Sequence, residues 1–61
     1  MKTSELIKIL QKGGCFKIRN GKRHDIWESP ITGNSFPVGR HPHKEVPTGT
    51  ADNILKAAGL K

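Results

Sequence analysis

The 61-residue sequence predicts an α+β fold, in the order α-β-β-β-α, in which two helices pack on one face of a three-stranded antiparallel sheet. Two observations predict it. Apolar residues recur at helical spacing near both ends of the chain, whereas residues in the middle alternate between apolar and polar, as in strands. A chain of this length buries only about 60% of its unfolded surface, so we expect a thin core between one helical layer and one sheet. This makes a single domain over residues 1–61.

Each helix is predicted from an apolar stripe and a closing glycine. The first is expected to begin at Thr3 or Ser4, because either hydroxyl can accept a hydrogen bond from the free N–H groups of the first turn. It is expected to end at Gly13-Gly14. Its stripe consists of Leu6, Ile7, Ile9, Leu10 and Gly13. The last helix is expected to start near Thr48–Thr50 and to end at Gly59. Its stripe consists of Ala51, Ile54, Leu55 and Ala58.

The segment CFKIR alternates and is expected to form the first strand. Period-two geometry places Phe16 and Ile18 on the face against the helices. Lys17 and Arg19 then project from the opposite, open face of the sheet. Asn20-Gly21 follows and predicts a tight reversal, because both residues tolerate positive φ.

The second strand is expected from roughly Arg23 to Ser29, and the third within the segment SFPVGR, with the turn SPITGN between them. The third strand carries Phe36 and Val38. Since Pro37 cannot donate a hydrogen bond to a neighbouring strand, we expect this strand to lie at an edge of the sheet or to be irregular. The segment HPHKEVPTGT that follows is expected to be a loop.

Positive charge strongly exceeds negative charge: eleven Lys and Arg stand against five Asp and Glu, a net charge of +6. One stretch without any acidic residue holds Lys12, Lys17, Arg19, Lys22 and Arg23. Such a charge is either a solvated surface or a binding surface for a nucleic acid, an anionic membrane or an acidic protein. Because nothing offsets the charge locally, we favour the binding surface.

The start of the sequence does not have the pattern of a secretory signal peptide, since Lys8 and Gln11 interrupt its apolar positions. No apolar run approaches the roughly 20 residues that span a membrane. Cys15 is the single cysteine, so no internal disulfide can form, which is typical of a reducing compartment. We therefore expect a cytoplasmic protein that does not associate with a membrane.

The two faces of the second strand leave two possibilities open for its aromatic residue. The period of two puts Asp25 and Trp27 on one face. The other face holds His24, Ile26 and Glu28. If Ile26 packs inward, Trp27 lies on the open face beside cations and can stack on a nucleic-acid base. His24 then points inward by parity, but its place beside the turn lets it reach solvent. The alternative is that Trp27 covers the core.

His24 is the candidate catalytic group. RNA carries its own nucleophile, the 2′-OH, so its cleavage needs a base, an acid and cations for the charge that develops at phosphorus. An imidazole titrates near neutral pH and can fill either proton-transfer role. The cations that can stabilise the charge are Arg19, Lys22, Arg23 and Arg40. The alternative is a surface histidine without a chemical role, as most histidines are.

No metal ion or other cofactor is expected. The acidic residues are scattered along the chain, so a two-metal mechanism lacks ligands. A cysteine–histidine metal site would have to use Cys15, His24, His41 and His43, whose spacing matches no zinc pattern. We therefore expect a reaction that depends on protein side chains and on the RNA itself.

Two stretches, HDIWESPITGNSFPVGRH and KEVPTGTADNILKAAGL, resemble the HicA, or YcfA-like, family of toxins, which are mRNA interferases. The most specific parts are HDIW, GRH and GTADNILKAAGL, and the resemblance covers nearly the whole chain. The sequence departs from the family pattern at Lys22-Arg23, where many members have Gly-Ser, and at Gly39, where they have proline.

The resemblance implies the fold of double-stranded-RNA-binding domains and an endoribonuclease that cleaves mRNA in a stress response, with His24 as its catalytic residue. It also implies a hetero-oligomer with a HicB-type antitoxin, which covers the active surface and binds operator DNA through its own domain. Together with the charge pattern, it gives an expected RNA-binding set of Lys17, Arg19, Lys22, Arg23, Trp27, Arg40 and His41. The alternatives from other classes are a small RNA-binding module without turnover and a minor DNA-binding or ribosomal accessory protein.

Overall fold

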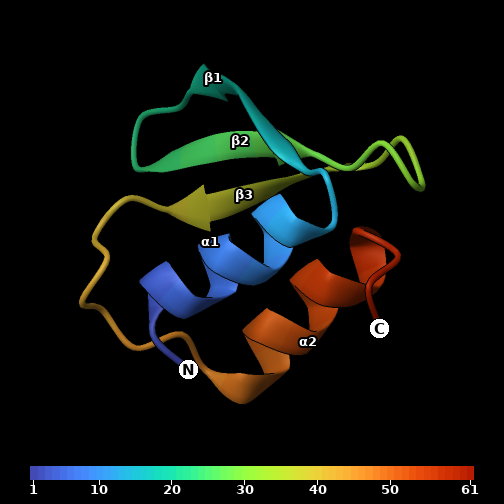
Figure 1. Cartoon of the computed structure of the whole chain (residues 1–61). Helices are drawn as coiled ribbons and strands as arrows, with labels where there is room; N and C mark the ends of the chain where they lie inside the picture. The colour runs from blue at the N-terminus through green and yellow to red at the C-terminus, as the bar shows by residue number, and fades with distance from the viewer.

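The computed structural model describes residues 1–61 and has the predicted order of elements. The helices are α1 (Thr3–Lys12) and α2 (Thr48–Ala57), and the strands are β1 (Phe16–Asn20), β2 (His24–Glu28) and β3 (Ser35–Gly39). The strands are antiparallel, in the order β1-β2-β3. Figure 1 shows both helices beneath one face of this sheet, while the other face is open. The predicted α-β-β-β-α fold is confirmed.

The two helices supply half of the core, and both end at glycine as predicted. The backbone φ is 86° at Gly14 and 76° at Gly59, the left-handed region that ends a helix without penalty at glycine. The buried apolar residues are Leu6, Leu10, Cys15, Trp27, Phe36, Val38, Ala51, Ile54, Leu55 and Ala58. Ile9 is the exception in the predicted stripes, since it is 37% exposed. Neither helix has the length and apolar character that a membrane crossing requires.

β1 lies at an edge of the sheet, and all of its residues are exposed. Both helices pack mainly on β3, at the opposite edge, so β1 lacks their cover. The expectation that Phe16 and Ile18 face the core is therefore wrong: each residue is 45% exposed. The pairing with β2 adds a second reason, because its register shifts between Lys17 and Arg19. Such an irregularity breaks the strict alternation of side chains.

Trp27 belongs to the core, which is the second of the two possibilities that the sequence left open. It is 8% exposed and lies opposite Phe36 of β3. Residues directly opposite each other in an antiparallel pair share a face, so both rings face the helices. Ile26, opposite Pro37, lies on the open face. A buried indole offers no free ring face for a base, and the position of Trp27 therefore argues against its predicted RNA contact.

The first turn of α1 is stabilised by the loop that precedes α2, and the predicted hydroxyl cap is wrong. The Thr3 N–H donates to the Lys44 carbonyl at 3.0 Å. The Ser4 N–H donates to the Pro42 carbonyl at 3.1 Å. The Thr3 hydroxyl does not cap the helix either, because it donates to the Lys44 carbonyl at 3.0 Å. The loop carbonyls thus satisfy the N–H groups that a cap would otherwise satisfy.

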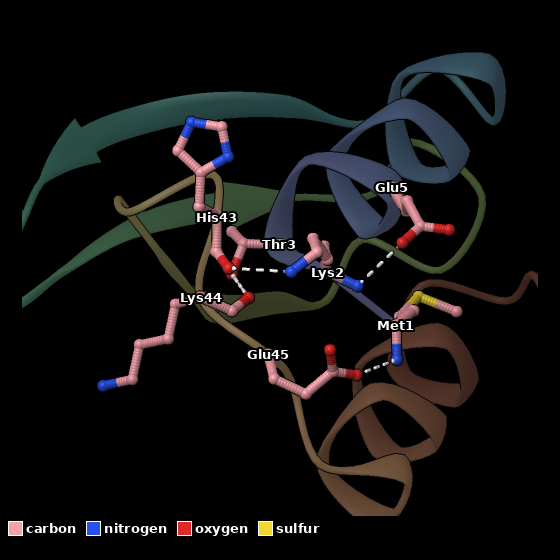
Figure 2. A network of polar contacts seen from close by, with 7 residues as sticks. All are labelled: Met1, Lys2, Thr3, Glu5, His43, Lys44 and Glu45. Atoms are coloured by element: carbon pink, nitrogen blue, oxygen red, sulfur yellow. Dashed lines mark hydrogen bonds and ion pairs between the residues drawn. The ribbon is translucent and has the colours of Figure 1, made fainter.

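Figure 2 shows how this loop is attached to the N-terminus of the chain. The Met1 ammonium lies 2.7 Å from a carboxylate oxygen of Glu45. The hydrogen bond from this ammonium, together with its charge, holds the pKa of Glu45 below its usual value. The Val46 N–H also donates to the Met1 carbonyl at 2.8 Å. These contacts hold the loop against α1 and so place Lys44 at one end of the sheet.

Candidate functional site

His24 is the first residue of β2 and is exposed. It follows a tight turn in which the Gly21 N–H donates to the His24 carbonyl at 2.9 Å, with Lys22 and Arg23 between them. Neither Asn20 nor Gly21 has a positive φ, so the predicted basis of the reversal is wrong. Glycine is required at position 21 for space, because an added Cβ would collide with the His24 carbonyl oxygen. This close approach fixes the His24 backbone at the end of the sheet.

A pocket of about 520 Å³ opens at this end of the sheet, and His24 lines it. We call it the basic pocket, because Lys, Arg and His side chains dominate its lining and no acidic or apolar side chain takes part. The residues come from the turn, the end of β3, the following loop and the start of α1, namely Thr3, Lys22, Arg23, His24, Gly39, Arg40, His41 and Lys44. The fold thus brings together five of the predicted site residues from two separate parts of the sequence.

Two residues of the basic pocket, Thr3 and Lys44, were missed by sequence reasoning. Thr3 is 3% exposed, and its hydroxyl is bonded to the Lys44 carbonyl. Lys44 lies in a basic loop segment, and this local charge could have indicated a binding residue. The sequence pattern does not show that this loop returns to the start of α1, and only that return brings Lys44 beside His24.

Lys17 and Arg19, the other predicted RNA contacts, lie outside the basic pocket and on opposite faces of the sheet. Lys17 is opposite Trp27 and faces the helix side, where its Nζ lies 4.0 Å from Oδ2 of Asp25. Arg19 is opposite Ile26 and faces the open side. The expectation that both project from the open face is therefore wrong for Lys17. Lys17 pairs with the inward-facing Trp27, and the register shift between the two residues turns Arg19 to the opposite face.

Asp25 orients one of the cations of the basic pocket, although it was not a predicted site residue. The Arg40 Nε donates to Asp25 Oδ1 at 2.9 Å. The Asp25 side chain is 17% exposed, so solvent and salt screen this pair less than a fully exposed one. The carboxylate holds the guanidinium at the rim of the pocket and offsets its charge. The positive charge that a ligand encounters in the pocket therefore comes mainly from the cations other than Arg40.

Gly39 forms the wall of the basic pocket between His24 and Thr3. It lies opposite His24 in the β2–β3 pairing. An added Cβ would lie 3.9 Å from the Thr3 hydroxyl oxygen and 4.0 Å from Cδ2 of the His24 ring, which are ordinary contact distances. A side chain at position 39 would therefore contact both the Thr3 hydroxyl and the imidazole, and glycine leaves that space open.

A second hollow, of about 590 Å³, adjoins the basic pocket, and we call it the β3–α2 groove. The two share Thr3, His24, Gly39 and Lys44. The rest of the groove is lined by Leu6, Phe36, Pro37, Glu45, Val46, Pro47, Thr50, Asn53 and Ile54. Sequence reasoning did not predict this groove, since it forms where a strand, a helix and the loop between them meet.

No three of the His, Cys, Asp and Glu side chains lie together in a way that could hold a metal ion. Cys15 is buried in the core. The combination of Cys15 with His24, His41 and His43 that the sequence offered is therefore not assembled. What the site does offer is an exposed imidazole that can accept or donate a proton, among cations that suit a phosphate.

Comparison with protein families places the chain among toxins. Residues 3–60 match the family described as HicA toxin of bacterial toxin-antitoxin. Comparisons with curated proteins and with solved structures give no significant match. The family match spans nearly the whole chain and agrees with the resemblance of the HDIW and GRH segments. The chain therefore belongs to the HicA toxin family, and its role is that of the toxin in a toxin-antitoxin system.

Proposed function

We propose that this toxin is an endoribonuclease that cleaves mRNA without a metal ion, with His24 as its single catalytic residue. The observation that carries the proposal is the position of the His24 imidazole, exposed in the wall of a pocket lined by cations and by no acid. Phosphate oxygens of RNA suit such a pocket, because each Lys or Arg contact is charge-assisted. The family match supports the proposal through the toxin role.

The reaction that suits the pocket begins at the RNA. The His24 imidazole accepts the proton of a 2′-OH, and the 2′ oxygen bonds to the adjacent phosphorus. The bond from phosphorus to the 5′ oxygen breaks, and this oxygen leaves with a proton from solvent, which reaches the open pocket. The products are a 2′,3′-cyclic phosphate and a 5′-OH. General base catalysis of this kind contributes about 10²–10⁴-fold to a rate.

The cations have two roles in this proposal. Lys22, Arg23 and Lys44 line the basic pocket beside His24 and stabilise the charge that develops on the phosphorane. Arg40, oriented by Asp25, and His41 complete the wall nearest the scissile group. Arg19 lies on the open face of β1 and holds the RNA backbone away from the reacting phosphate, a contact that supplies affinity without sequence preference.

The toxin role implies a partner, and we propose that it is an acidic antitoxin of the HicB type in a hetero-oligomer. The net charge of +6 supports an acidic partner, because complementary charge speeds association. Such a partner covers the basic pocket and excludes RNA, and it alone contacts operator DNA. The single toxin domain over residues 1–61 then acts on mRNA in the cytoplasm when it is released.

The experiment that tests the function compares His24→Ala with His43→Ala in cleavage of a labelled mRNA in excess EDTA. His43 is an exposed histidine on the same loop as His41, but it does not line the basic pocket. We expect the wild type and His43→Ala to cut at equal rates, and His24→Ala to cut about 10²–10⁴-fold more slowly. Unchanged cleavage by His24→Ala refutes the assignment. Activity that EDTA abolishes and Mg²⁺ restores refutes the metal-free reaction.

The same assay separates the enzyme from a binding module. If the protein is a small RNA-binding domain without turnover, all three proteins retain RNA binding and none cuts. His24→Ala is expected to change the free energy of unfolding by less than about 1 kcal/mol, as for other exposed positions. Its loss of cleavage then cannot be attributed to unfolding.

A further inference from the structure

The β3–α2 groove differs in chemistry from the basic pocket that it adjoins. Apolar carbon dominates its lining: Leu6 and Phe36 are buried beneath it, and the proline rings at 37 and 47 stand exposed beside it. Its one carboxylate, Glu45, is paired with the Met1 ammonium at 2.7 Å. Away from the residues that it shares with the basic pocket, the groove therefore presents an almost neutral surface next to a strongly cationic one. A ligand that fills both must carry an anionic part and a flat or apolar part.

α2 supplies the polar groups of this groove. Thr50, Asn53 and Ile54 are spaced i, i+3 and i+4, which places them on one face of the helix. Ile54 is 8% exposed and forms the floor of the groove. Thr50 and Asn53 are exposed and lie at its margin, so a hydroxyl and an amide are available to a ligand. An apolar hollow with a few convergent polar groups is typical of a small-ligand site.

We propose that the groove binds one nucleobase of the RNA, next to the scissile phosphate, and that Asn53 and Thr50 determine which base is accepted. The inference rests on the proposed ribonuclease function. Its main support is continuity: the groove and the basic pocket share His24, and a nucleotide joins its base to its phosphate through a single sugar. A phosphate in the basic pocket thus brings its own base to the groove. Bases of single-stranded RNA are recognised in this way, splayed from the strand and bonded along their edges.

The Asn53 side chain leads to a specific expectation about the base. An amide offers a donor and an acceptor side by side, and its usual bidentate partner among the bases is adenine, through N6 and N7. The Thr50 hydroxyl both donates and accepts, so it adds affinity without excluding a base. We therefore expect adenine to be preferred, and Asn53 to carry most of the preference.

The test measures binding of four 2′-O-methyl homotetranucleotides, of adenine, cytosine, guanine and uracil, by fluorescence anisotropy. The methyl group blocks the attacking hydroxyl, so the wild-type protein is used and no cleavage occurs. We expect the adenine tetramer to bind about tenfold more tightly than the uracil tetramer, as for one bidentate base contact. Asn53→Ala should bring this ratio close to one while affinity for the uracil tetramer changes less than about twofold, since the phosphate contacts remain.

Gln11→Ala is the matched control, because Gln11 is an exposed helical amide that lines a different hollow, beside β1. It should leave the ratio unchanged. A second measurement does not depend on any variant: the adenine tetramer should shift the backbone amide resonances of Val46, Thr50 and Asn53 in the wild type.

Equal binding of the four tetramers by the wild type overturns the inference, and so does an adenine preference that survives Asn53→Ala. Resonance shifts confined to the basic pocket also overturn it. The binding assay contains no cleavage step, so these outcomes are independent of whether His24 is catalytic. Conversely, an active wild type that cuts mRNA without base preference retains the proposed function and excludes the base-binding groove.

Discussion

The two ends of the sheet use polar side chains in opposite ways. At the end where β2 turns into β3, hydroxyl and amide groups bond to the last carbonyls of α2. Ser29 Oγ donates to the Ala58 carbonyl at 2.6 Å, and Thr32 Oγ1 donates to the Ala57 carbonyl at 2.6 Å. At the other end, the Lys, Arg and His side chains of the basic pocket are exposed to solvent. One end therefore serves the stability of the fold, and the other keeps its polar groups for a ligand.

This division reflects what free helix ends require. The carboxyl end of α2 has unpaired carbonyls, which the turn between β2 and β3 satisfies. The amino end of α1 has unpaired N–H groups, which loop backbone carbonyls satisfy instead of side chains. Near the basic pocket, backbone carbonyls satisfy the free N–H groups of α1. The side chains of Lys22, Arg23 and His24 are therefore not needed to cap this helix. A stable fold and an available site thus coexist in a short chain.

After His24→Ala, Gly21→Ala is expected to have the largest effect on the ligand-binding end. An added Cβ collides with the His24 carbonyl oxygen, which is backbone and must move. A shift of about 1 Å at a catalytic group can cost about 10²-fold in rate, so cleavage should fall by about 10–100-fold. Gly49→Ala is the control, because nothing lies within 4 Å of its added Cβ. Equal cleavage rates for the two variants would show that the turn does not position His24.

Ser29→Ala is expected to have the largest effect on the structural end. Ser29 is fully buried, and its loss leaves the Ala58 carbonyl without its partner. We expect the free energy of unfolding to fall by about 1–3 kcal/mol, measured by urea denaturation. Ser35→Ala, at an exposed position of β3, should change it by less than about 0.5 kcal/mol. Under conditions where both variants are folded, both should cut RNA like the wild type, and a selective loss in Ser29→Ala would contradict the separation of the two ends.

Arg19 and Lys17 test how far the RNA-binding surface extends beyond the basic pocket. Arg19 is on the open face, whereas Lys17 faces the helix side beside Asp25. Arg19→Ala should weaken binding of all single-stranded RNA sequences alike and reduce the salt slope by about 0.7. Lys17→Ala should change the slope less. The reverse order would place the RNA on the helix side of β1, and a loss confined to one sequence would mean that Arg19 reads a base.

The sequence predicts the elements of this fold well because the signals are local. The apolar stripes, the glycines at the helix ends and Pro37 on the edge strand β3 each act within a few residues. The faces of β1 are mispredicted because they depend on how β2 pairs with it: Lys17 lies opposite the buried Trp27, and the register shifts before Arg19. The side of Trp27 stayed open for a related reason, since alternation shows which residues share a face but not which face meets the helices.

The candidate site is predictable in part for a similar reason. Lys22, Arg23 and His24 are neighbours in sequence. The pairing of His24 with Gly39 brings Arg40 and His41 close to them. Thr3 and the β3–α2 groove were missed because they depend on the return of the loop to α1. Those contacts involve residues about forty positions apart, and no local pattern encodes them.

The smallest expected effect concerns Glu45, which joins this loop to the N-terminus beside the basic pocket. The Met1 ammonium lowers the pKa of Glu45 in the folded protein. A carboxylate with a lowered folded pKa adds stability above its unfolded pKa and loses it as the pH falls through the folded value. The stability difference between wild type and Glu45→Gln should therefore be constant near neutral pH and decline as the pH falls below about 4.3, the ordinary pKa of a glutamate. Both partners are exposed, so the difference is small and shrinks further in high salt.

Acetylation of the N-terminus provides the control for Glu45. It removes the ammonium charge, so Glu45→Gln in the acetylated protein should have no further effect on urea denaturation at any pH between about 3 and 7. A pH-dependent difference that survives acetylation would mean that another cation, such as Lys2, holds the carboxylate. The ion pair of Glu45 would then involve a side chain rather than the Met1 ammonium, and it would tolerate residues added before Met1. The backbone hydrogen bonds from Thr3 and Ser4 hold the loop against α1 in either case.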